Sequence, residues 1–337
     1  MLSYTCSPPG SIIYSTYGHF LSPEEFHLVI VKPHSISYYL TNQVYDSAEP
    51  DVELPFEATI IGSHVFTLPS HQCSSIALIT LDLTLIILSA PFSKEEGQNT
   101  EEDEQDMPIE RTVCDQIRST HVIPSRYSPL FASANNQLYL SVYPNSLRVI
   151  TFSDVNSSVV LEKNEIHFQK FIPRFLYGDS ENQKIYSYDT VDNTIKIIDL
   201  EKVPAALEEQ SFDSSDLLFT EKIQLKDENG VDFDVDYFIL HNGHFLIFTK
   251  NNLINQSTNE RYELPNATGV ISVSIVDENI IYISFKNGDF YSFDQISKEF
   301  TFYENMRPFT SIAPIDEGDV MLFSKNEQPL IYNTLQK

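Results

Sequence analysis

The sequence predicts an all-β protein that folds as one β-propeller, with seven blades that are WD-like but carry no WD signature. Short runs rich in β-branched and aromatic residues recur along all 337 residues, with 23 Phe, 18 Tyr and no Trp, and such residues favour strands. Asn-Gly stands twice between two such runs, and this dipeptide is the strongest short-range hairpin signal. The runs also recur at roughly the 40–50-residue period of four-stranded blades.

The first third of the chain holds four strand-like runs. They are Phe26–Lys32, Ser35–Leu40, Ala58–Leu68 and Ser75–Ser89. Several runs are apolar at successive positions rather than at alternate ones, which indicates strands that are covered on both faces. That pattern is typical of the middle strands of propeller blades, and also of a sandwich of two sheets.

Four hairpins are predicted in the rest of the chain, each across a short segment of turn residues. They pair Gln137–Tyr143 with Ser146–Phe152, Lys184–Asp189 with Thr194–Leu200, Tyr237–Leu240 with His244–Thr249, and Ile280–Phe285 with Asp289–Phe293. The intervening residues include Asn145, Asn193, Gly243 and Gly288, and Asn and Gly are the residues that tolerate the left-handed conformation of tight turns.

Grouping these runs gives seven units within one domain that spans residues 1–337. The units are 11–42, 53–90, 120–165, 166–225, 234–264, 269–303 and 309–335. Because closing a propeller removes the open edges of its end blades, we expect Ile12–Tyr14 and Leu330–Tyr332 to close the ring. A large β-sandwich or two smaller β domains are the alternative architectures, since no Gly-His…Trp-Asp blade motif is present.

Two segments depart from the strand pattern. Ser93–Glu110 contains eight acidic residues, one Lys and almost no apolar residue, so it is predicted to be a disordered loop. Residues 202–215 are predicted to form a second loop with one helical turn, around Pro204 to Glu209.

The charge of the chain limits its partners. Lys and Arg number 21 against 48 Asp and Glu, a net charge of −27, whereas a phosphate-binding surface needs clustered basic side chains. Tight nucleic-acid binding is therefore not expected, and basic protein partners are. Three cysteines indicate a reducing compartment rather than a disulfide framework. We also expect no signal peptide and no membrane insertion, because the longest apolar stretch is too short to span a bilayer.

No catalytic, cofactor-binding or metal site is predicted, and the sequence does not specify the partner-binding residues. Motifs for nucleotide binding and for hydrolase nucleophiles are absent. Three clusters were weighed as metal ligands, and their spacing fits no known zinc or calcium pattern. The clusters are His64, His71 and Cys73; His241 and His244; and Asp232, Asp234 and Asp236.

Four stretches of the sequence carry a family resemblance. Tyr17–Lys32 contains Gly18-His19-Phe20, then Ser22 and Glu24, then the strand-like Leu28-Val29-Ile30. It resembles the opening of the first, N-terminal propeller in the family of the large damaged-DNA-binding protein subunit and the large cleavage and polyadenylation specificity factor subunit. Leu138–Ile150 and Phe171–Gly178 are similar to two later stretches of that propeller, and Phe285–Tyr291 more weakly to a hairpin.

The resemblance implies a non-enzymatic protein-interaction scaffold of a nuclear multiprotein assembly. Known members carry three propellers and a helical tail, and this chain has room for one propeller. The expected role is that of a cullin-RING ubiquitin ligase adaptor in DNA repair or heterochromatin, because the opening motif is closest to that branch. The alternatives are a structural propeller of another assembly such as the nuclear pore, or a scaffold of RNA 3′-end processing or splicing. The expected location is the nucleus, with the cytoplasm as a second compartment, and no cofactor is expected.

Overall fold

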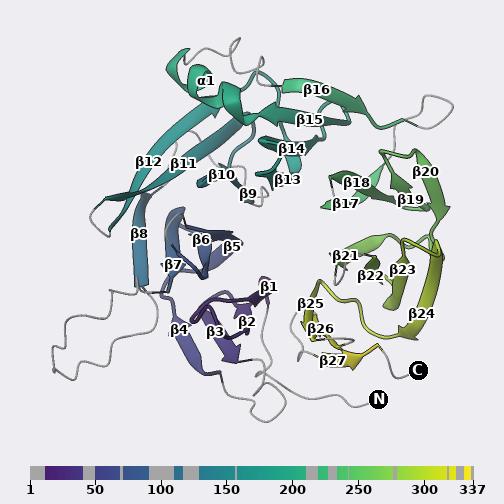
Figure 1. Cartoon of the computed structure of the whole chain (residues 1–337). Coiled ribbons are helices and arrows are strands. Elements are labelled where there is room, and N and C mark those ends of the chain that lie inside the picture. Colours follow the sequence, from purple (N-terminus) through teal and green to yellow (C-terminus); the bar gives the residue numbers. More distant parts are fainter. Residues whose placement is uncertain are drawn as a thin grey trace.

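Seven small antiparallel sheets surround a central axis as the blades of a β-propeller, which confirms the predicted fold class (Figure 1). The chain is represented by a computed structural model. The structure describes residues 12–40, 50–68, 71–90, 110–116, 129–155, 158–209, 219–226, 234–241, 243–275, 279–316, 319–323 and 330–334.

In each blade the strands follow one another in sequence order, so each strand pairs with its chain neighbour. Blade 1 contains β1 (Tyr14–Gly18), β2 (His27–Val31), β3 (Ser35–Leu40) and β4 (Val52–Pro55). Blade 2 contains β5 (Ile60–Thr67), β6 (Ser74–Thr80), β7 (Thr84–Ser89) and β8 (Glu110–Gln116). Blade 3 contains β9 (Leu130–Ala134), β10 (Gln137–Ser141), β11 (Ser146–Val155) and β12 (Ser158–His167).

Blades 4 to 6 repeat this four-stranded arrangement, and blade 7 has three strands among the described residues. Blade 4 contains β13 (Pro173–Asp179), β14 (Lys184–Asp189), β15 (Thr194–Asp199) and β16 (Phe219–Gln224). Blade 5 contains β17 (Val235–His241), β18 (His244–Thr249), β19 (Asn252–Asn255) and β20 (Glu260–Glu263). Blade 6 contains β21 (Val270–Ile275), β22 (Ile280–Phe285), β23 (Asp289–Asp294) and β24 (Glu299–Asn305), and blade 7 contains β25 (Ser311–Asp316), β26 (Asp319–Phe323) and β27 (Leu330–Asn333).

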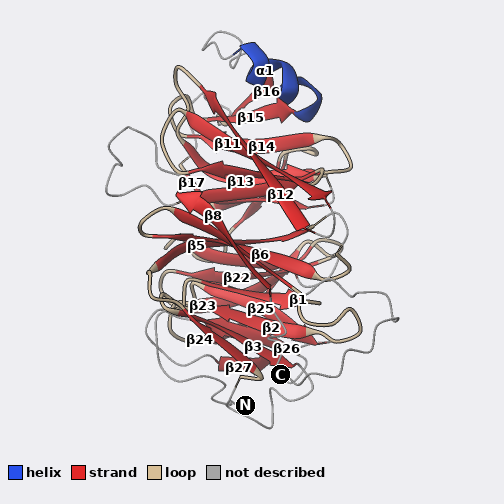
Figure 2. Ribbon diagram, turned by 90° about the vertical axis from the view of Figure 1, so that its left-hand side faces the viewer, coloured by secondary structure: helices blue, strands red, loops and turns tan. Residues whose placement is uncertain are grey.

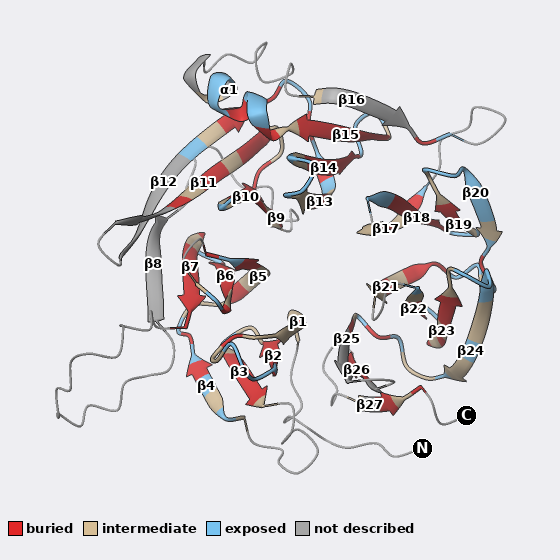
Figure 3. Ribbon diagram, viewed as in Figure 1, coloured by how far each residue is buried: buried red, intermediate tan, exposed pale blue. Residues whose placement is uncertain are grey.

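Burial follows the position of a strand within its blade. Every residue of β2 is buried, as is nearly every residue of β6, β7 and β14, whereas no residue of β20 or β24 is buried (Figure 3). Middle strands are covered on both faces by the neighbouring blades, and this explains why their sequences are apolar at successive positions. Seen edge-on, the blades are stacked closely around the ring (Figure 2).

The strand order gives the ring two faces (Figure 2). The connection face carries the chain segments between blades and the turns between second and third strands, such as Asn145 and Gly288. The hairpin face carries the turns between first and second strands, such as Asn135–Asn136 and Gly243, and the turns between third and fourth strands. Because neighbouring strands are antiparallel, these two sets of turns lie at opposite ends of the strands.

A backbone hydrogen bond recurs on the connection face. In five blades the residue directly after the fourth strand donates its backbone N–H to a carbonyl in the turn between the second and third strands. The pairs are Phe56–His34, Phe168–Asn145, Leu225–Asn193, Leu264–Asn251 and Met306–Gly288, at 2.7–3.3 Å. Any residue except proline can supply this backbone donor, but all five donors are large apolar residues (Phe, Leu or Met), so an apolar position recurs directly after the fourth strand.

The core lies between blades rather than inside one of them. Phe66 of blade 2 stacks on Phe152 of blade 3 at 5.0 Å, and Phe238 and Phe245 of blade 5 belong to a cluster shared with Tyr186 of blade 4. Each blade therefore buries its apolar surface on its two neighbours, and one blade removed would expose two such surfaces.

The ring closes by packing of blade 1 on blade 7. Leu28, Ile30 and Tyr39 of blade 1 form one cluster with Met321 and Phe323 of blade 7. Beside it the hydroxyls of Ser15 and Ser311 lie 2.7 Å apart.

The predicted closing strands are therefore wrong. Tyr14 pairs with Val31 inside blade 1, and Leu330 pairs with Leu322 inside blade 7. The error has a physical reason: among the described residues the end blades meet face to face through side chains, and not by sharing a sheet.

Three further predictions need correction. Ser75–Ser89 is not one run but the hairpin β6–β7, which turns at Leu81–Leu83. The predicted boundary between the first two units is wrong, because β4 belongs to blade 1 and β8 completes blade 2. The helical turn predicted around Pro204 to Glu209 is longer than expected: residues 203–209 form the helix α1 (Val203–Glu209), preceded by the 3-10 turn Leu200–Lys202. Val203 and Leu207, one helical turn apart, pack on the cluster between blades 3 and 4.

The structure bears on the other segment predictions only in part. The units proposed from residue 120 onward fall on blades 3 to 7. The predicted acidic loop lies outside the described residues except for Glu110, which is the first residue of β8.

Candidate interaction surfaces

The three clusters considered as metal ligands, none of which was predicted to be a metal site, lie at different places in the ring, and the structure describes two of them in full. Within the described part of the chain, no group of three or more His, Cys, Asp and Glu side chains could hold a metal ion. His64 lies within β5, while Cys73 lies just before β6, beyond the Thr67–Ser74 pair at the far end of that hairpin. The Cys73 thiol is free and buried, and burial raises its pKa.

His64 instead joins two blades. Its Nε2 lies 3.1 Å from the Ser133 hydroxyl of β9, and its ring stacks parallel to the Phe131 ring at 5.9 Å. Burial lowers the pKa of His64 to about 4, because no acidic partner compensates the loss of water around a charged imidazolium. His64 is therefore neutral at physiological pH and acts as a structural contact between blades 2 and 3.

The other two clusters are surface features of blade 5. His241 and His244 face each other across the turn at Gly243, whose φ of +72° is a conformation that glycine adopts without strain. Of the three aspartates, Asp232 lies outside the described residues and Asp234 is exposed. The Asp236 carboxylate lies 3.1 Å from Nζ of Lys286 in blade 6, so it joins neighbouring blades.

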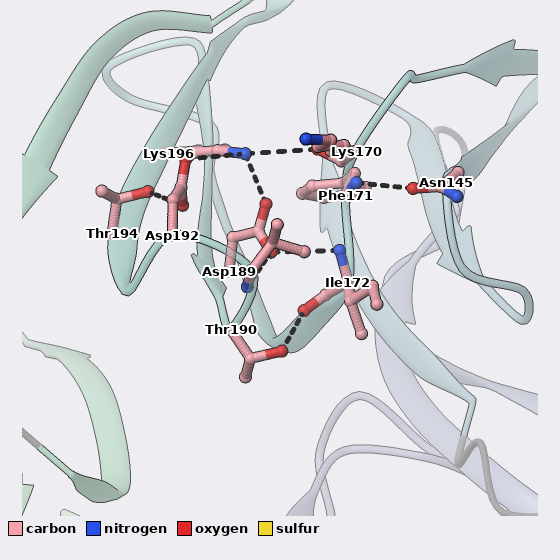
Figure 4. A network of polar contacts seen from close by, with 10 residues as sticks. Asn145, Lys170, Phe171, Ile172, Asp189, Thr190, Asp192, Thr194 and Lys196 are labelled. Atoms are coloured by element: carbon pink, nitrogen blue, oxygen red, sulfur yellow. Dashed lines mark hydrogen bonds and ion pairs between the residues drawn. The ribbon is translucent and has the colours of Figure 1, made fainter.

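A buried ion pair lies on the connection face of blade 4 (Figure 4). Lys196 is 3% exposed and Asp189 is fully buried, and their side chains are in direct contact. Asp192, which is partly exposed, approaches the same Nζ at 3.4 Å. The ammonium also lies over the rings of Phe171 and Phe219, at 5.9 and 5.0 Å from their centres. A buried cation is thus matched by two carboxylates and two aromatic faces.

The second oxygen of the Asp189 carboxylate completes this network. It accepts hydrogen bonds from the backbone N–H of Ile172, at 3.1 Å, and of Val191, at 3.0 Å. The Asn145 side chain accepts the N–H of Phe171 at 2.6 Å. The network therefore fastens the connection between blades 3 and 4 to the turn that follows β14, and it fixes the shape of that part of the face.

Sequence reasoning did not identify this pair, although a signal was present. Lys196 stands between Ile195 and Ile197 in a run that is otherwise apolar, and a lysine that faces the interior needs a buried counter-charge. Asp189, at the end of the partner strand, was the available acid.

Three tyrosines lie on the innermost strands of their blades: Tyr14 on β1, Tyr177 on β13 and Tyr237 on β17. Burial raises the pKa of all three phenols, and the neighbouring phenol Tyr14 is a second cause for Tyr237. The Tyr177 hydroxyl donates to the backbone carbonyl of Phe238 in blade 5. These phenols are protonated at neutral pH, and that of Tyr177 joins blade 4 to blade 5 as a hydrogen-bond donor.

The opening motif of the chain forms the loop between β1 and β2 on the hairpin face. The His19 carbonyl accepts the N–H of Ser74 in blade 2 at 2.7 Å, and Phe20 is buried in the cluster between blades 1 and 2. Ser22 caps the loop by accepting the N–H of Glu24. Phe26 is 46% exposed and stacks on Tyr17 at 5.0 Å. Each of these residues thus has a local contact, and Phe26, although half exposed, packs on Tyr17 and on the His19 ring at 3.9 Å.

Two grooves open between blades. The hairpin-face groove has a volume of about 700 Å³ and is lined mainly by hydroxyl and amide side chains, which are Thr67, Ser133, Asn135, Asn136, Gln137 and Ser180. Asn135 of blade 3, which lines the groove, and the exposed Gln183 of blade 4 hydrogen bond to each other through their side-chain amides in both directions.

The connection-face groove lies between blades 1 and 2 and has a volume of about 560 Å³. It is lined by Pro55, Phe56, Glu57, Ala58, Thr80, Asp82, Thr84 and Ile86. Hydrogen bonds from the hydroxyls of Thr80 and Thr84 lower the pKa of Asp82, so its carboxylate is ionised at neutral pH. Sequence reasoning could not find this groove, because it joins segments of two different blades.

Comparisons with known proteins do not assign the chain to a family. No protein-family model matches the sequence, and no curated protein matches it. The described residues include no helix with the length and apolar character that crossing a membrane requires. The identification of surfaces therefore rests on the geometry of the ring and on the sequence motifs.

Proposed function

We propose that this protein is a non-enzymatic protein-interaction scaffold of a nuclear multiprotein assembly. The observation that carries the proposal is a pair of open grooves between blades, one on each face, together with the recurring backbone hydrogen bonds that hold the turns of the connection face. Grooves on a rigid frame suit the docking of extended segments of other proteins, since less conformational freedom is lost on binding.

The resemblance of the opening motif supports a more specific role. Gly18-His19-Phe20 and the residues after them resemble the family of the large damaged-DNA-binding protein subunit, whose members act in cullin-RING ubiquitin ligases. We therefore propose an adaptor-like role in DNA repair or heterochromatin. The net charge of −27 favours basic protein partners over nucleic acid in that setting.

Affinity purification of the tagged full chain from its source cell tests the proposal. After nuclease treatment at moderate salt, we expect a stoichiometric partner that is a ubiquitin-ligase or chromatin component. Partners from RNA 3′-end processing, splicing or the nuclear pore would keep the scaffold and replace the adaptor role. Recovery of a monomer alone, together with nanomolar binding of the pure protein to DNA or RNA, would overturn the proposal.

A further inference from the structure

We infer that the connection-face groove between blades 1 and 2 docks a partner segment in which a lysine or arginine stands next to an aliphatic side chain. The inference rests on the proposed scaffold function and names the chemistry of the partner. Its basis is the coincidence at one place of a groove, two carboxylates and an exposed leucine.

The floor of the groove is apolar and formed by two blades. Phe56 is 7% exposed and lies directly after β4, and Ile86 is 3% exposed and lies within β7. Pro55 and Ala58 extend this surface along the connection to blade 2. An aliphatic side chain that enters the groove would therefore exchange water for apolar contacts.

Two carboxylates flank this floor. Glu57 is exposed on the connection between blades, and Asp82 is exposed in the β6–β7 turn. The lowered pKa of Asp82 keeps its charge at neutral pH. Both hydroxyls that bind Asp82 belong to its own turn, and no Lys or Arg of the described residues contributes to its lowered pKa. The pair attracts a cation, and the acidic molecule as a whole reinforces this selection.

The side chain of Leu81 adds an apolar contact beside the carboxylates. It is 65% exposed, although the next leucine, Leu83, is only 2% exposed. The backbone N–H of Leu81 donates to the Thr59 carbonyl at 2.7 Å, which holds the turn beside the connection that carries Glu57 and Ala58. Because Leu83 is buried at a φ of +63°, the turn is fixed with Leu81 outward. An aliphatic side chain of the partner can therefore pack on the exposed side chain of Leu81.

Fluorescence anisotropy with a labelled peptide tests the inference. The probe alternates leucine and arginine between glycine ends, and two companions replace either leucine by serine or arginine by glutamate. At physiological salt we expect the leucine–arginine peptide to bind at least about tenfold tighter than the serine–arginine peptide, because each leucine that enters the groove removes apolar surface from water. The leucine–glutamate peptide should not bind.

Matched variants locate the site. Leu81→Ser and Glu57→Gln should each weaken the leucine–arginine peptide several-fold. Ile296→Ser and Glu181→Gln make the same changes at exposed positions on the hairpin face and should leave affinity unchanged. The inference would be overturned if the groove variants bound the leucine–arginine peptide as tightly as the control variants do. It would also be overturned if the serine–arginine peptide bound the unsubstituted protein as tightly as the leucine–arginine peptide does. Either result would indicate unspecific attraction to an acidic protein. Melting curves of all four variants confirm that each is folded.

The cellular partner separates this inference from the proposed function. The affinity purification is repeated with the double variant Leu81→Ser/Glu57→Gln. If this variant no longer recovers the partner that the unsubstituted chain recovers, the groove is the docking site of that partner. If the doubly substituted chain still recovers the partner in equal amount, the scaffold function stands and the groove is rejected as the site. If neither chain recovers a partner, while the peptides discriminate as expected, the groove stands and the proposed function fails.

Discussion

At the scale of single residues, the most consequential feature is the burial of Lys196 against Asp189. Removing two charges from water is costly, and the cost is recovered only where contacts satisfy both groups. Here the carboxylate receives two backbone N–H groups as well as the ammonium, and the ammonium has a second acid in Asp192. The pair therefore holds the connection between blades 3 and 4 against blade 4. Its contribution to stability depends on both charged residues being present.

A double-mutant cycle at this pair should show strong coupling. We expect Lys196→Met alone to cost about 3 kcal/mol in the free energy of unfolding, because an unpaired buried carboxylate remains. Asp189→Asn should cost less, since Asp192 still approaches the ammonium at 3.4 Å. The double variant should cost less than the sum of the two, as measured by urea denaturation. Strictly additive costs would show that the two charges do not stabilise each other.

His64 should make stability depend on pH. Its pKa in the folded protein is about 4, below the value near 6.5 expected in the unfolded chain. The contribution of the neutral ring is therefore fully present above pH 6.5 and is lost as the pH falls toward 4, by roughly 1–2 kcal/mol at pH 5.

Comparison with His64→Phe isolates this effect, because phenylalanine keeps a ring against Phe131 and does not titrate. We expect the unfolding free energy of the unsubstituted protein to fall more between pH 8 and pH 5 than that of the variant. The comparison is of differences, since protonation of the many carboxylates acts on both proteins alike. Identical pH profiles would show that His64 is not buried in its neutral form.

At the scale of strands and turns, the sequence predicts best where special residues mark a turn. Asn145, Asn193 and Gly288 have positive φ values of 61°, 52° and 91° at the predicted turns, and Asn and Gly tolerate this conformation. The β6–β7 hairpin was missed because Leu83 occupies the corresponding position with a φ of +63°. A leucine gives no turn signal, and the run around it reads as one apolar segment.

The fold could be predicted from local features of the sequence, and the grooves between blades could not. The ring could be predicted because apolar periodicity and turn residues are local properties of the sequence. The connection-face groove could not, since Phe56 and Ile86 come from different blades and meet only in the folded ring. The recurring hydrogen bond between blade ends and turns is made by backbone atoms, and the apolar residue type at its donor position, as at Phe56 and Leu264, does not by itself predict the contact.

The close approach of β9 and β13 makes Gly178 indispensable. A Cβ atom on Gly178 would lie 2.0 Å from the carbonyl oxygen of Ser133, and backbone cannot move aside as a side chain can. We expect Gly178→Ala to separate the two innermost strands and to lower the free energy of unfolding by at least about 2 kcal/mol.

Gly62→Ala is the matched control for this prediction. Its new Cβ would meet the side chains of Phe131 and Pro129 at 3.1 and 3.3 Å, and these can shift by a few tenths of an ångström. We expect a smaller loss, below about 1 kcal/mol in urea denaturation. Equal losses for the two variants would mean that β9 and β13 are not in close backbone contact.

At the scale of the whole molecule, the stability of the ring depends on the contacts between neighbouring blades. The blades hold each other through shared clusters, and the junction of blade 7 with blade 1 is made by side chains rather than by a shared sheet. Blade 7 is also fastened to blade 6: Tyr332 packs on Phe290 and Tyr303 at 5.8 Å each, and the Thr334 hydroxyl lies 2.9 Å from that of Tyr282. Damage at the end of the chain should therefore spread to the whole ring.

Truncation after Glu327 tests this cooperativity, because it removes β27 with Tyr332 and Thr334. We expect the melting temperature to fall by more than about 5 °C, in one transition that circular dichroism and tyrosine fluorescence report together, since an open ring exposes apolar surface on both sides of the break. Truncation after Thr334 keeps every contact named above and should melt like the intact chain. If the chain ending at Glu327 also melts like the intact protein, β27 does not contribute to closure. A separate early transition would instead show that blade 7 unfolds independently and that the other six blades form a stable unit.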